Sequence, residues 1–252
     1  MYCVVAASRA PSLARAPKGP AGLGRPRVVP VDGPAGTTTL WMIVADAPAG
    51  RFGEDDINRN IANVDWVSRI AVAHEAVVAS FIGADAVLPM KLFTIFINDE
   101  RAAAHLSAER AQIERLLGRV AKHDEWGIRV VLDGRKPARA HTAKAAPSGA
   151  SYLTRKKTQR DARAELVERS REVAAGLFDR LAAMGSDARR RPASEMPVKG
   201  SPLLLDAAFL VPRSHAARFR STIAQQAKAL RPRGYTVSLT GPWPPYSFMS
   251  QS

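Results

Sequence analysis

The chain has 252 residues, of which 46% are hydrophobic and 24% are charged, as is typical of a globular protein long enough for one large or two small domains. No apolar run reaches the roughly 18 residues needed to cross a bilayer. The single cysteine, Cys3, excludes an internal disulfide and a cysteine-based metal cluster. The net charge of +14 comes largely from residues 135–191, which contain fifteen Lys or Arg and six Asp or Glu.

The first half of the chain is expected to alternate strands and helices. Runs of β-branched or alternating apolar residues predict strands over residues 2–7, 27–31, 38–45, 87–96 and 126–133. Apolar residues at steps of three and four predict helices over residues 61–81 and 98–122, and the stretch 46–60 is expected to be a surface loop. This order predicts an α+β fold with an N-terminal ferredoxin-like α/β sandwich over residues 1–134.

The second half of the chain begins with a predicted linker. Residues 135–149 are rich in Lys, Arg, Ala and Pro and have no apolar period, so we expect a basic linker. A C-terminal α+β domain is expected over residues 150–252, with a long helix from about 151 to 184 and a loop over 189–202. A β-α-β unit follows, with a strand over 203–211, a helix capped by Ser214 and a final strand over 235–240.

The first part of the long predicted helix, residues 154–165, is rich in charge, with seven charged residues among twelve, and includes Arg155, Lys156 and Lys157. Two interpretations stay open: a solvated helix face, or a docking surface for an acidic partner. Nucleic-acid binding through residues 135–191 is an alternative function, and it predicts an affinity that falls steeply with salt. The charged run has no interleaved aromatic residues for base stacking, so we do not expect nucleic acid as a partner.

The C-terminal segment, residues 240–248, combines prolines with aromatic residues: Pro242, Pro244 and Pro245 with Trp243, Tyr246 and Phe248. The prolines fix φ and lack N–H groups, so we expect an extended segment that is neither an interior helix nor a central strand. Each aromatic side chain can bury on the order of 150–250 Å². The sequence leaves open whether the segment packs on its own domain or binds a partner.

His74 lies in the apolar stripe of the helix predicted over residues 61–81, and Glu75 follows it. A His-Glu pair is part of a metalloprotease motif, but Val78 occupies the position of the required second histidine. The alternative is a core histidine that bonds a neighbouring strand or loop. The chain also lacks a Gly-rich phosphate loop and a GxSxG elbow. We therefore expect no enzymatic activity, no cofactor and no metal site.

Residues 241–248, Gly-Pro-Trp-Pro-Pro-Tyr-Ser-Phe, resemble the C-terminal signature of the gas vesicle protein L/F family (GvpL/GvpF). Further blocks resemble the family in the same order, at residues 74–78, 88–94, 125–130 and 149–153. The resemblance implies two α+β domains and an accessory or minor structural component of gas vesicles, the gas-filled protein shells that provide buoyancy. It also implies contacts with the small hydrophobic shell protein and with other accessory proteins, without enzymatic activity.

The mechanism that we expect is binding. The sheet faces and the C-terminal segment are expected to cover apolar surface of the shell protein until that subunit joins a growing wall, with the basic segment selecting acidic partners. The residues expected at partner surfaces are Pro242, Trp243, Pro244, Pro245, Tyr246, Phe248, Arg155, Lys156 and Lys157. No basic region precedes the short apolar run at the N-terminus, so we expect a cytoplasmic, gas-vesicle-associated protein without a signal peptide.

Overall fold

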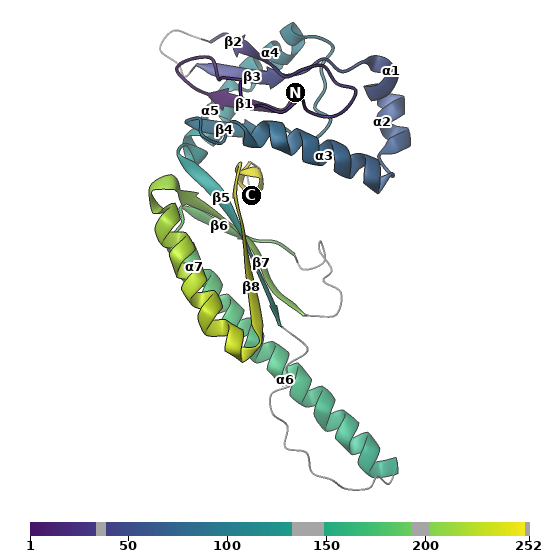
Figure 1. Ribbon diagram of the computed structural model, residues 1–252, viewed down its shortest axis with the longest axis vertical. Coiled ribbons are helices and arrows are strands. Elements are labelled where there is room, and N and C mark those ends of the chain that lie inside the picture. The colour runs from purple at the N-terminus through teal and green to yellow at the C-terminus, as the bar shows by residue number, and fades with distance from the viewer. Residues whose placement is uncertain (34–38, 133–148, 193–201, 250–252) are drawn as a thin grey trace. The chain divides into compact units, whose positions relative to one another are not determined.

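The computed structural model describes residues 1–33, 39–132, 149–192 and 202–249 (Figure 1). These residues belong to two compact units. The first unit comprises Met1–Glu125 together with Pro242–Ser252, and the second comprises Trp126–Gly241. The chain therefore returns to its first unit at the C-terminus.

Four strands form the sheet of the first unit, in the order β2-β3-β1-β4. They are β1 (Cys3–Ala6), β2 (Arg27–Val31), β3 (Leu40–Val44) and β4 (Ala86–Pro89). Strand β1 runs antiparallel to both neighbours, with Val4 opposite Met42 on β3 and Leu88 on β4. All four residues of β1 are buried, because this central strand is covered on both faces. Pro30 lies on the edge strand β2, where a missing N–H is tolerated.

Helix α3 (Val64–Ala79) packs its apolar stripe on this sheet, and Asn63 caps it by accepting a hydrogen bond from the N–H of Trp66 at 3.1 Å. The single helix predicted over residues 98–122 is two helices, α4 (Asp99–Ala108) and α5 (Arg110–Val120). They meet at Glu109, whose φ of −96° and ψ of 9° depart from helical values. The apolar pattern continues across this bend, so periodicity alone does not reveal it.

The stretch 46–60 contains two short helices, α1 (Ala49–Phe52) and α2 (Glu54–Asn60), where the sequence predicts a loop. Glu54, Asp55 and Asp56 occupy the first turn of α2, where carboxylates interact favourably with the helix dipole. The loop prediction correctly took these acidic residues as a sign of a surface position. It overlooked that acidic residues also favour the N-terminus of a helix.

The strand predicted over residues 87–96 is confined to β4, which ends at Pro89. Beyond it, Phe93 has a φ of 64°, in the left-handed region that a bulky residue rarely adopts. The N–H of Thr94 donates to the carbonyl oxygen of Lys91 at 3.1 Å, and the Phe93 ring stacks on Trp66 with centroids 5.4 Å apart. The apolar run therefore makes a turn after β4.

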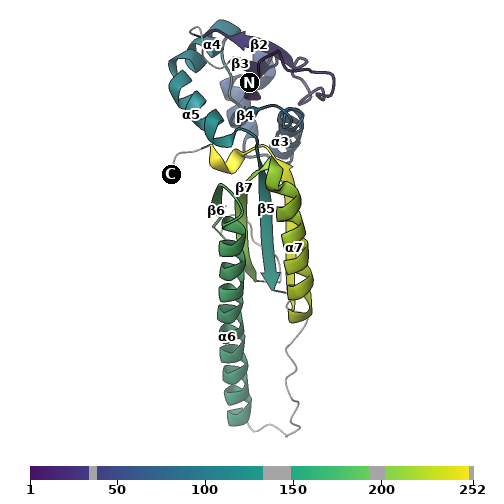
Figure 2. The same ribbon diagram turned by 90° about the vertical axis from the view of Figure 1, so that its left-hand side faces the viewer.

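The second unit has the βαββαβ order of a ferredoxin-like fold. Its elements are β5 (His123–Leu132), α6 (Gly149–Ala182), β6 (Asp187–Arg190), β7 (Leu203–Pro212), α7 (Ala216–Leu230) and β8 (Tyr235–Trp243). The strand order is β6-β7-β5-β8, and β6 runs antiparallel to β7. Helices α6 and α7 lie beside β5 in Figure 2 and share one core cluster with alternate residues of the strands, so they cover the same sheet face.

Aromatic rings fill the centre of this second core. Phe209 of β7 contacts Phe178 of α6 and Phe219 of α7, with ring centroids 5.5 and 5.6 Å apart. At the periphery, the buried hydroxyl of Tyr235 donates to the Oγ of Ser170 at 3.1 Å, which ties β8 to α6. Large interlocking side chains from both helices thus hold this unit together.

The predicted domain division differs from this arrangement. The sequence assigns the strand over residues 126–133 to the first domain, whereas β5 is hydrogen-bonded to β7 and β8. The ferredoxin-like topology therefore belongs to the second unit, and the first unit ends at Glu125 instead of residue 134. Alternation specifies a half-buried strand without specifying its sheet. Most of the predicted linker over 135–149 lies outside the described residues.

Two local predictions in the second unit are also wrong. Residues 187–190 form β6, an edge strand paired with β7, where the sequence predicts a loop from residue 189. Ser214 does not cap α7, because residues Arg213–His215 form a 3-10 turn and His215 is the N-cap residue, without a side-chain hydrogen bond. The helix therefore begins later than the Ser214 signal indicates.

Candidate functional site

The C-terminal segment continues from β8, an edge strand of the second sheet. Gly241 has a φ of 114°, a conformation that side-chain-bearing residues rarely adopt, so glycine is needed at this bend. The N–H groups of Tyr246 and Phe248 then donate to the carbonyl oxygens of Pro244 and Pro245 at 2.8 and 3.0 Å. The segment is thus extended as far as Trp243 and ends in a 3-10 turn over Tyr246–Phe248, where the sequence predicts an extended chain throughout.

Phe248 anchors this segment within the first unit, since its side chain is completely buried. Beside it, Ser247 donates two hydrogen bonds to Glu125, one from its backbone N–H to Oε2 and one from its hydroxyl to Oε1, each 2.7 Å long. Glu125 is itself buried, and hydrogen bonds to a carboxylate are stronger than those between neutral groups. The buried Phe248, together with the buried Pro244 and Pro245, and the charge-assisted contact of Ser247 with Glu125 therefore fix the end of the segment.

Trp243 and Tyr246 remain on the surface, with 39% and 38% of their area exposed. Pro244 and Pro245 lie between them and restrict the backbone that carries both rings. Side chains held in this way lose less conformational freedom on binding than those of a free tail. The segment thus combines a buried anchor with two half-exposed aromatic rings.

Two carboxyl groups, those of Glu75 and Glu125, lie near Tyr246. Burial raises the pKa of Glu75, and the neighbouring Glu125 raises it further. Burial also raises the pKa of the Tyr246 phenol, and among its charged neighbours Glu75 has the largest effect. Tyr246 therefore keeps its proton at neutral pH, with the carboxyl groups of Glu75 and Glu125 nearby.

The basic residues predicted to bind partners lie on α6 in the second unit. Lys157 is exposed, whereas the side chains of Arg155 and Lys156 lie outside the described part of the structure. Among the described side chains of α6, Val167 is the first that packs on the core. The earlier part of the helix extends beyond the end of the second sheet (Figure 1). Its charged residues include a surface ion pair between Arg160 and Asp161, 3.7 Å apart.

His74 is a buried core residue, as one of the two sequence interpretations proposes. Its pKa is lowered to about 4, mainly by burial and to a smaller extent by the N-terminal ammonium group, while a hydrogen bond with the backbone of Met90 acts in the opposite direction. The imidazole is therefore neutral at physiological pH. Among the described residues, no group of three or more His, Cys, Asp or Glu is placed to hold a metal ion.

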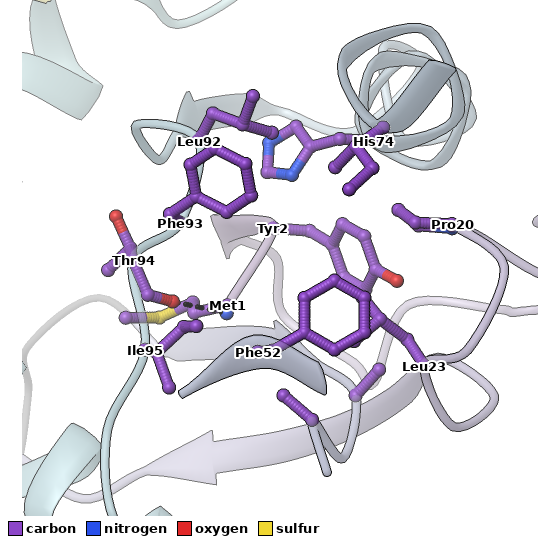
Figure 3. A pocket seen from close by; sticks show the side chains of 13 residues that line it. Met1, Tyr2, Pro20, Leu23, Phe52, His74, Leu92, Phe93, Thr94 and Ile95 are labelled. Carbon is purple, nitrogen blue, oxygen red and sulfur yellow. Dashed lines mark hydrogen bonds between the residues drawn. The ribbon is translucent and has the colours of Figure 1, made fainter. Parts of the chain in front are cut away.

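A hollow of about 40 Å³ lies beside His74 (Figure 3). The rings of Tyr2, Phe52 and Phe93 line it together with aliphatic side chains. The Tyr2 hydroxyl and His74 Nε2 are buried and have no hydrogen-bond partner among the described residues. This hollow was not predicted from the sequence, although residues 92–95, which border it, lie within the strand predicted over residues 87–96.

Comparison with known proteins identifies the chain. A family model described as "Gas vesicle synthesis protein GvpL/GvpF" matches residues 1–250. The chain belongs to the GvpL/GvpF family. A curated relative, gas vesicle protein L of Streptomyces sp. (strain CB03234), is 30% identical over 219 residues, which span 83% of this chain and 79% of the relative.

Crystal structures show that other members share the fold. GvpF from Anabaena sp. PCC7120 aligns with a TM-score of 0.60 and 18% identity, covering 100% of this chain and 95% of that protein. GvpF from Microcystis aeruginosa aligns with a TM-score of 0.61 and 13% identity, covering 99% and 98%. This GvpL/GvpF protein is therefore a gas vesicle protein with the mixed α+β fold of those structures. Its described helices are all too short or too polar to cross a membrane.

The structure separates the sequence-predicted site residues of this GvpL/GvpF protein into two groups. The six residues of the C-terminal segment lie together in one short stretch, and Phe248 is buried while Trp243 and Tyr246 are half-exposed. The basic triplet 155–157 lies on a helix of the other unit. Glu125 and Ser247, which hold the segment, were absent from the prediction, because neither residue type nor spacing indicates a contact across so much of the chain.

Proposed function

We propose that this GvpL/GvpF protein acts in the cytoplasm as an accessory or minor structural component of gas vesicle assembly, and that it binds the small shell protein and other accessory proteins. The observation that carries the binding role is the C-terminal segment, in which buried Phe248 anchors half-exposed Trp243 and Tyr246. Aromatic residues in such positions are typical of binding hot spots. The rings cover apolar surface of the shell subunit until the subunit is added to the wall.

The basic part of α6 has a second role in this proposal. Lys157 and its charged neighbours lie on a stretch of helix that contributes no described side chain to the core. A positively charged, exposed helix attracts acidic partners and speeds their association. We assign it to contacts with other accessory proteins that carry acidic surfaces.

Co-purification of the shell protein with this chain tests the role of the C-terminal segment. A truncation after Thr240 is unsuitable, because it also removes the buried Phe248 and the Ser247 hydrogen bonds to Glu125. The sharper variant is Trp243→Ser with Tyr246→Ser, which keeps the anchor. We expect it to retain about tenfold less shell protein than the wild type and to keep less of it soluble during co-expression.

The matched control is Ile61→Ser with Val64→Ser, which changes two exposed apolar residues of the same unit, 55% and 74% exposed. This control is expected to retain as much shell protein as the wild type. Equal retention by the Trp243/Tyr246 variant and the control, with both folded, would show that the rings do not bind. If the wild type itself neither retains nor solubilises the shell protein, direct shell binding is wrong.

A further inference from the structure

The two edges of the second sheet differ in their protection against pairing. At one edge lies β6, which is only four residues long and carries Asp187, Arg189 and Arg190. At the other edge lies β8, which is nine residues long and contains no charged residue. Its single proline, Pro242, follows the bend at Gly241. Because short strands, charged side chains and prolines are what keep an edge from pairing, β6 is protected and residues 235–240 of β8 are not.

The backbone of β8 has hydrogen-bonding capacity to spare. As the last strand in the order β6-β7-β5-β8, it has one neighbour and presents a row of N–H and C=O groups on its outer side. Figure 1 shows β8 running along the front of this sheet. Within the described residues, no backbone group of residues 235–243 forms a hydrogen bond outside the sheet. Such a row of donors and acceptors is what the addition of a further strand uses.

The surface beside β8 is basic. Asp206 is the last acidic residue of the chain, and residues 207–252 contain six Lys or Arg and no Asp or Glu. Five of these cations are exposed on α7 or in the turn that joins it to β8, namely Arg218, Arg220, Lys228, Arg231 and Arg233. None of the five forms an ion pair within the described residues. Their positive charge is therefore available to an incoming partner.

Helix α7 lies on the β8 side of the sheet. Figure 2 shows α7 and α6 on opposite sides of β5, and Tyr235, Val237 and Leu239 of β8 pack in the same core cluster as the buried residues of α7. The connection from β7 through α7 to β8 is right-handed, as such crossovers nearly always are. In this arrangement, a residue that directly follows a buried position of α7 lies on the side of the outer edge, and one that directly precedes it lies on the side of α6.

Two arginines of α7 occupy the positions that face the β8 edge. Arg220 directly follows the buried Phe219, and Arg231 directly follows the buried Leu230. Arg218 directly precedes Phe219 and so lies on the opposite side of the helix. At about 1.5 Å per helical residue, Arg220 and Arg231 are roughly 16 Å apart, which is the span of about four to six residues of a strand. Alternate side chains of one added strand can therefore meet both arginines.

We propose that the outer edge of β8 binds an extended segment of a partner protein in which Asp or Glu occupies alternate positions. The segment pairs its backbone with β8 and directs its carboxylates to Arg220 and Arg231. Its other side chains lie beside Thr236 and Ser238, which are exposed on the sheet face away from the helices. This site goes beyond the proposed function, which assigns acidic partners to α6.

The charge and the edge together select this occupant. A second copy of the chain fits less well, because pairing two β8 strands would bring the basic sides of two α7 helices together. Nucleic acid fits less well too, because β8 offers backbone groups and hydroxyl side chains where bases need aromatic rings for stacking. An acidic polypeptide satisfies both the unpaired backbone and the unpaired cations.

The test is fluorescence anisotropy with the full chain and a labelled peptide of about eight residues in which Glu and Val alternate. We expect binding that weakens as salt is added. A peptide of alternating Lys and Val is the charge control. The same Glu and Val peptide, N-methylated at every residue, keeps its carboxylates but cannot donate backbone hydrogen bonds. Each of the two controls is expected to bind about tenfold more weakly.

Protein variants test the position of the site. Arg220→Glu is expected to weaken binding of the acidic peptide about fivefold, because it places a carboxylate beside the β8 edge. Arg218→Glu is the matched control, since it makes the same change at an exposed residue on the opposite side of the same helix. It is expected to bind within about twofold of the wild type. Circular dichroism checks that both variants are folded.

Three results would overturn the inference. Equal affinity for the N-methylated and unmodified peptides would show that the β8 edge is not used. Equal losses in the Arg220→Glu and Arg218→Glu variants would show that overall charge acts without a defined site. Tighter binding of an oligothymidylate, or dimers of the chain that the acidic peptide dissociates, would identify a different occupant. Co-purification of the shell protein tests the proposed function separately, and its outcome does not depend on these peptides.

Discussion

The C-terminal segment and the first part of α6 were both predicted from the sequence to bind partners, but they differ in how their described side chains contact the core. The C-terminal segment is held by completely buried Phe248 and by two hydrogen bonds from Ser247 to Glu125. The described side chains of α6 reach the core only from Val167 onward. The first stretch combines a buried anchor with exposed rings, whereas the second presents charge on a helix whose described side chains make no contact with the core before Val167.

This difference shows that one aromatic and proline-rich stretch can contribute a buried side chain to the core and still leave other aromatic side chains exposed for binding. Apolar rings gain free energy by burial wherever a surface accepts them, so one of the three becomes an anchor and two remain exposed. Charged side chains gain little from exposed ion pairs and are not drawn to the core. Stability should therefore depend strongly on the first stretch and hardly on the second.

The largest expected effect is that of Phe248→Ala. Removing a fully buried phenylalanine leaves a cavity and costs about 3–5 kcal/mol of unfolding free energy. Chemical denaturation monitored on the first unit measures the loss, and limited proteolysis shows whether the segment detaches. Tyr246→Ala is the control, since this ring is 38% exposed, and it should cost about 1 kcal/mol or less. Equal losses for the two variants would mean that the anchor and the exposed ring are not distinct.

The next effect concerns the polar contact. Glu125→Ala leaves the Ser247 N–H without its acceptor, so we expect a loss of about 2–3 kcal/mol in unfolding free energy. A double-mutant cycle with Ser247→Ala isolates the hydroxyl bond, and its coupling energy should be about 1 kcal/mol. Strict additivity of the two substitutions would indicate that this bond contributes nothing to docking.

A smaller effect of opposite sign is expected at Glu75. Its pKa lies above the ordinary value of 4.5, so the fold favours its protonated form. That stabilisation is fully present below about pH 4.5 and is lost as pH rises through the higher, folded-state value. Glu75→Gln should therefore stabilise the protein at pH 7 and raise its melting temperature. The gain in unfolding free energy should be less than about 1 kcal/mol, because the site is partly exposed to solvent.

The gap between wild type and Glu75→Gln should shrink as the pH is lowered toward 4.5. Melting curves at several pH values measure it, with Asp85→Asn as a control carboxylate on the exposed surface. A Glu75→Gln variant that is less stable than the wild type at pH 7 would show that ionised Glu75 is favourable in the fold, which contradicts the raised pKa.

The smallest effect is expected on α6. Lys157→Glu with Arg160→Glu changes two exposed side chains, so the unfolding free energy should stay within about 0.5 kcal/mol of the wild type. Binding to acidic accessory proteins should weaken, and the weakening should be greater at low salt. A large loss of stability would show that this part of α6 has tertiary support.

Local chemistry made several elements predictable. Runs of β-branched residues predicted where β1, β2 and β3 lie along the chain. Apolar residues spaced three and four apart around His74 predicted α3. The break at Glu109, the left-handed turn at Phe93 and the sheet to which β5 belongs were not predictable, because each depends on which surfaces the chain meets after folding. Alternation of apolar and polar residues shows which side chains of a strand share a face, but it does not show which strands lie next to it in a sheet.

The sequence by itself determined that this is a two-sheet α+β member of the GvpL/GvpF family, because secondary-structure periods and the Gly-Pro-Trp-Pro-Pro-Tyr-Ser-Phe signature are local properties of the chain. Only the tertiary structure decided which ring of that signature is buried, that Glu125 holds Ser247, and that the run after β4 borders a small hollow. Burial and hydrogen bonding at these sites join residues far apart in the sequence, so their free energies exist only once the surfaces have met.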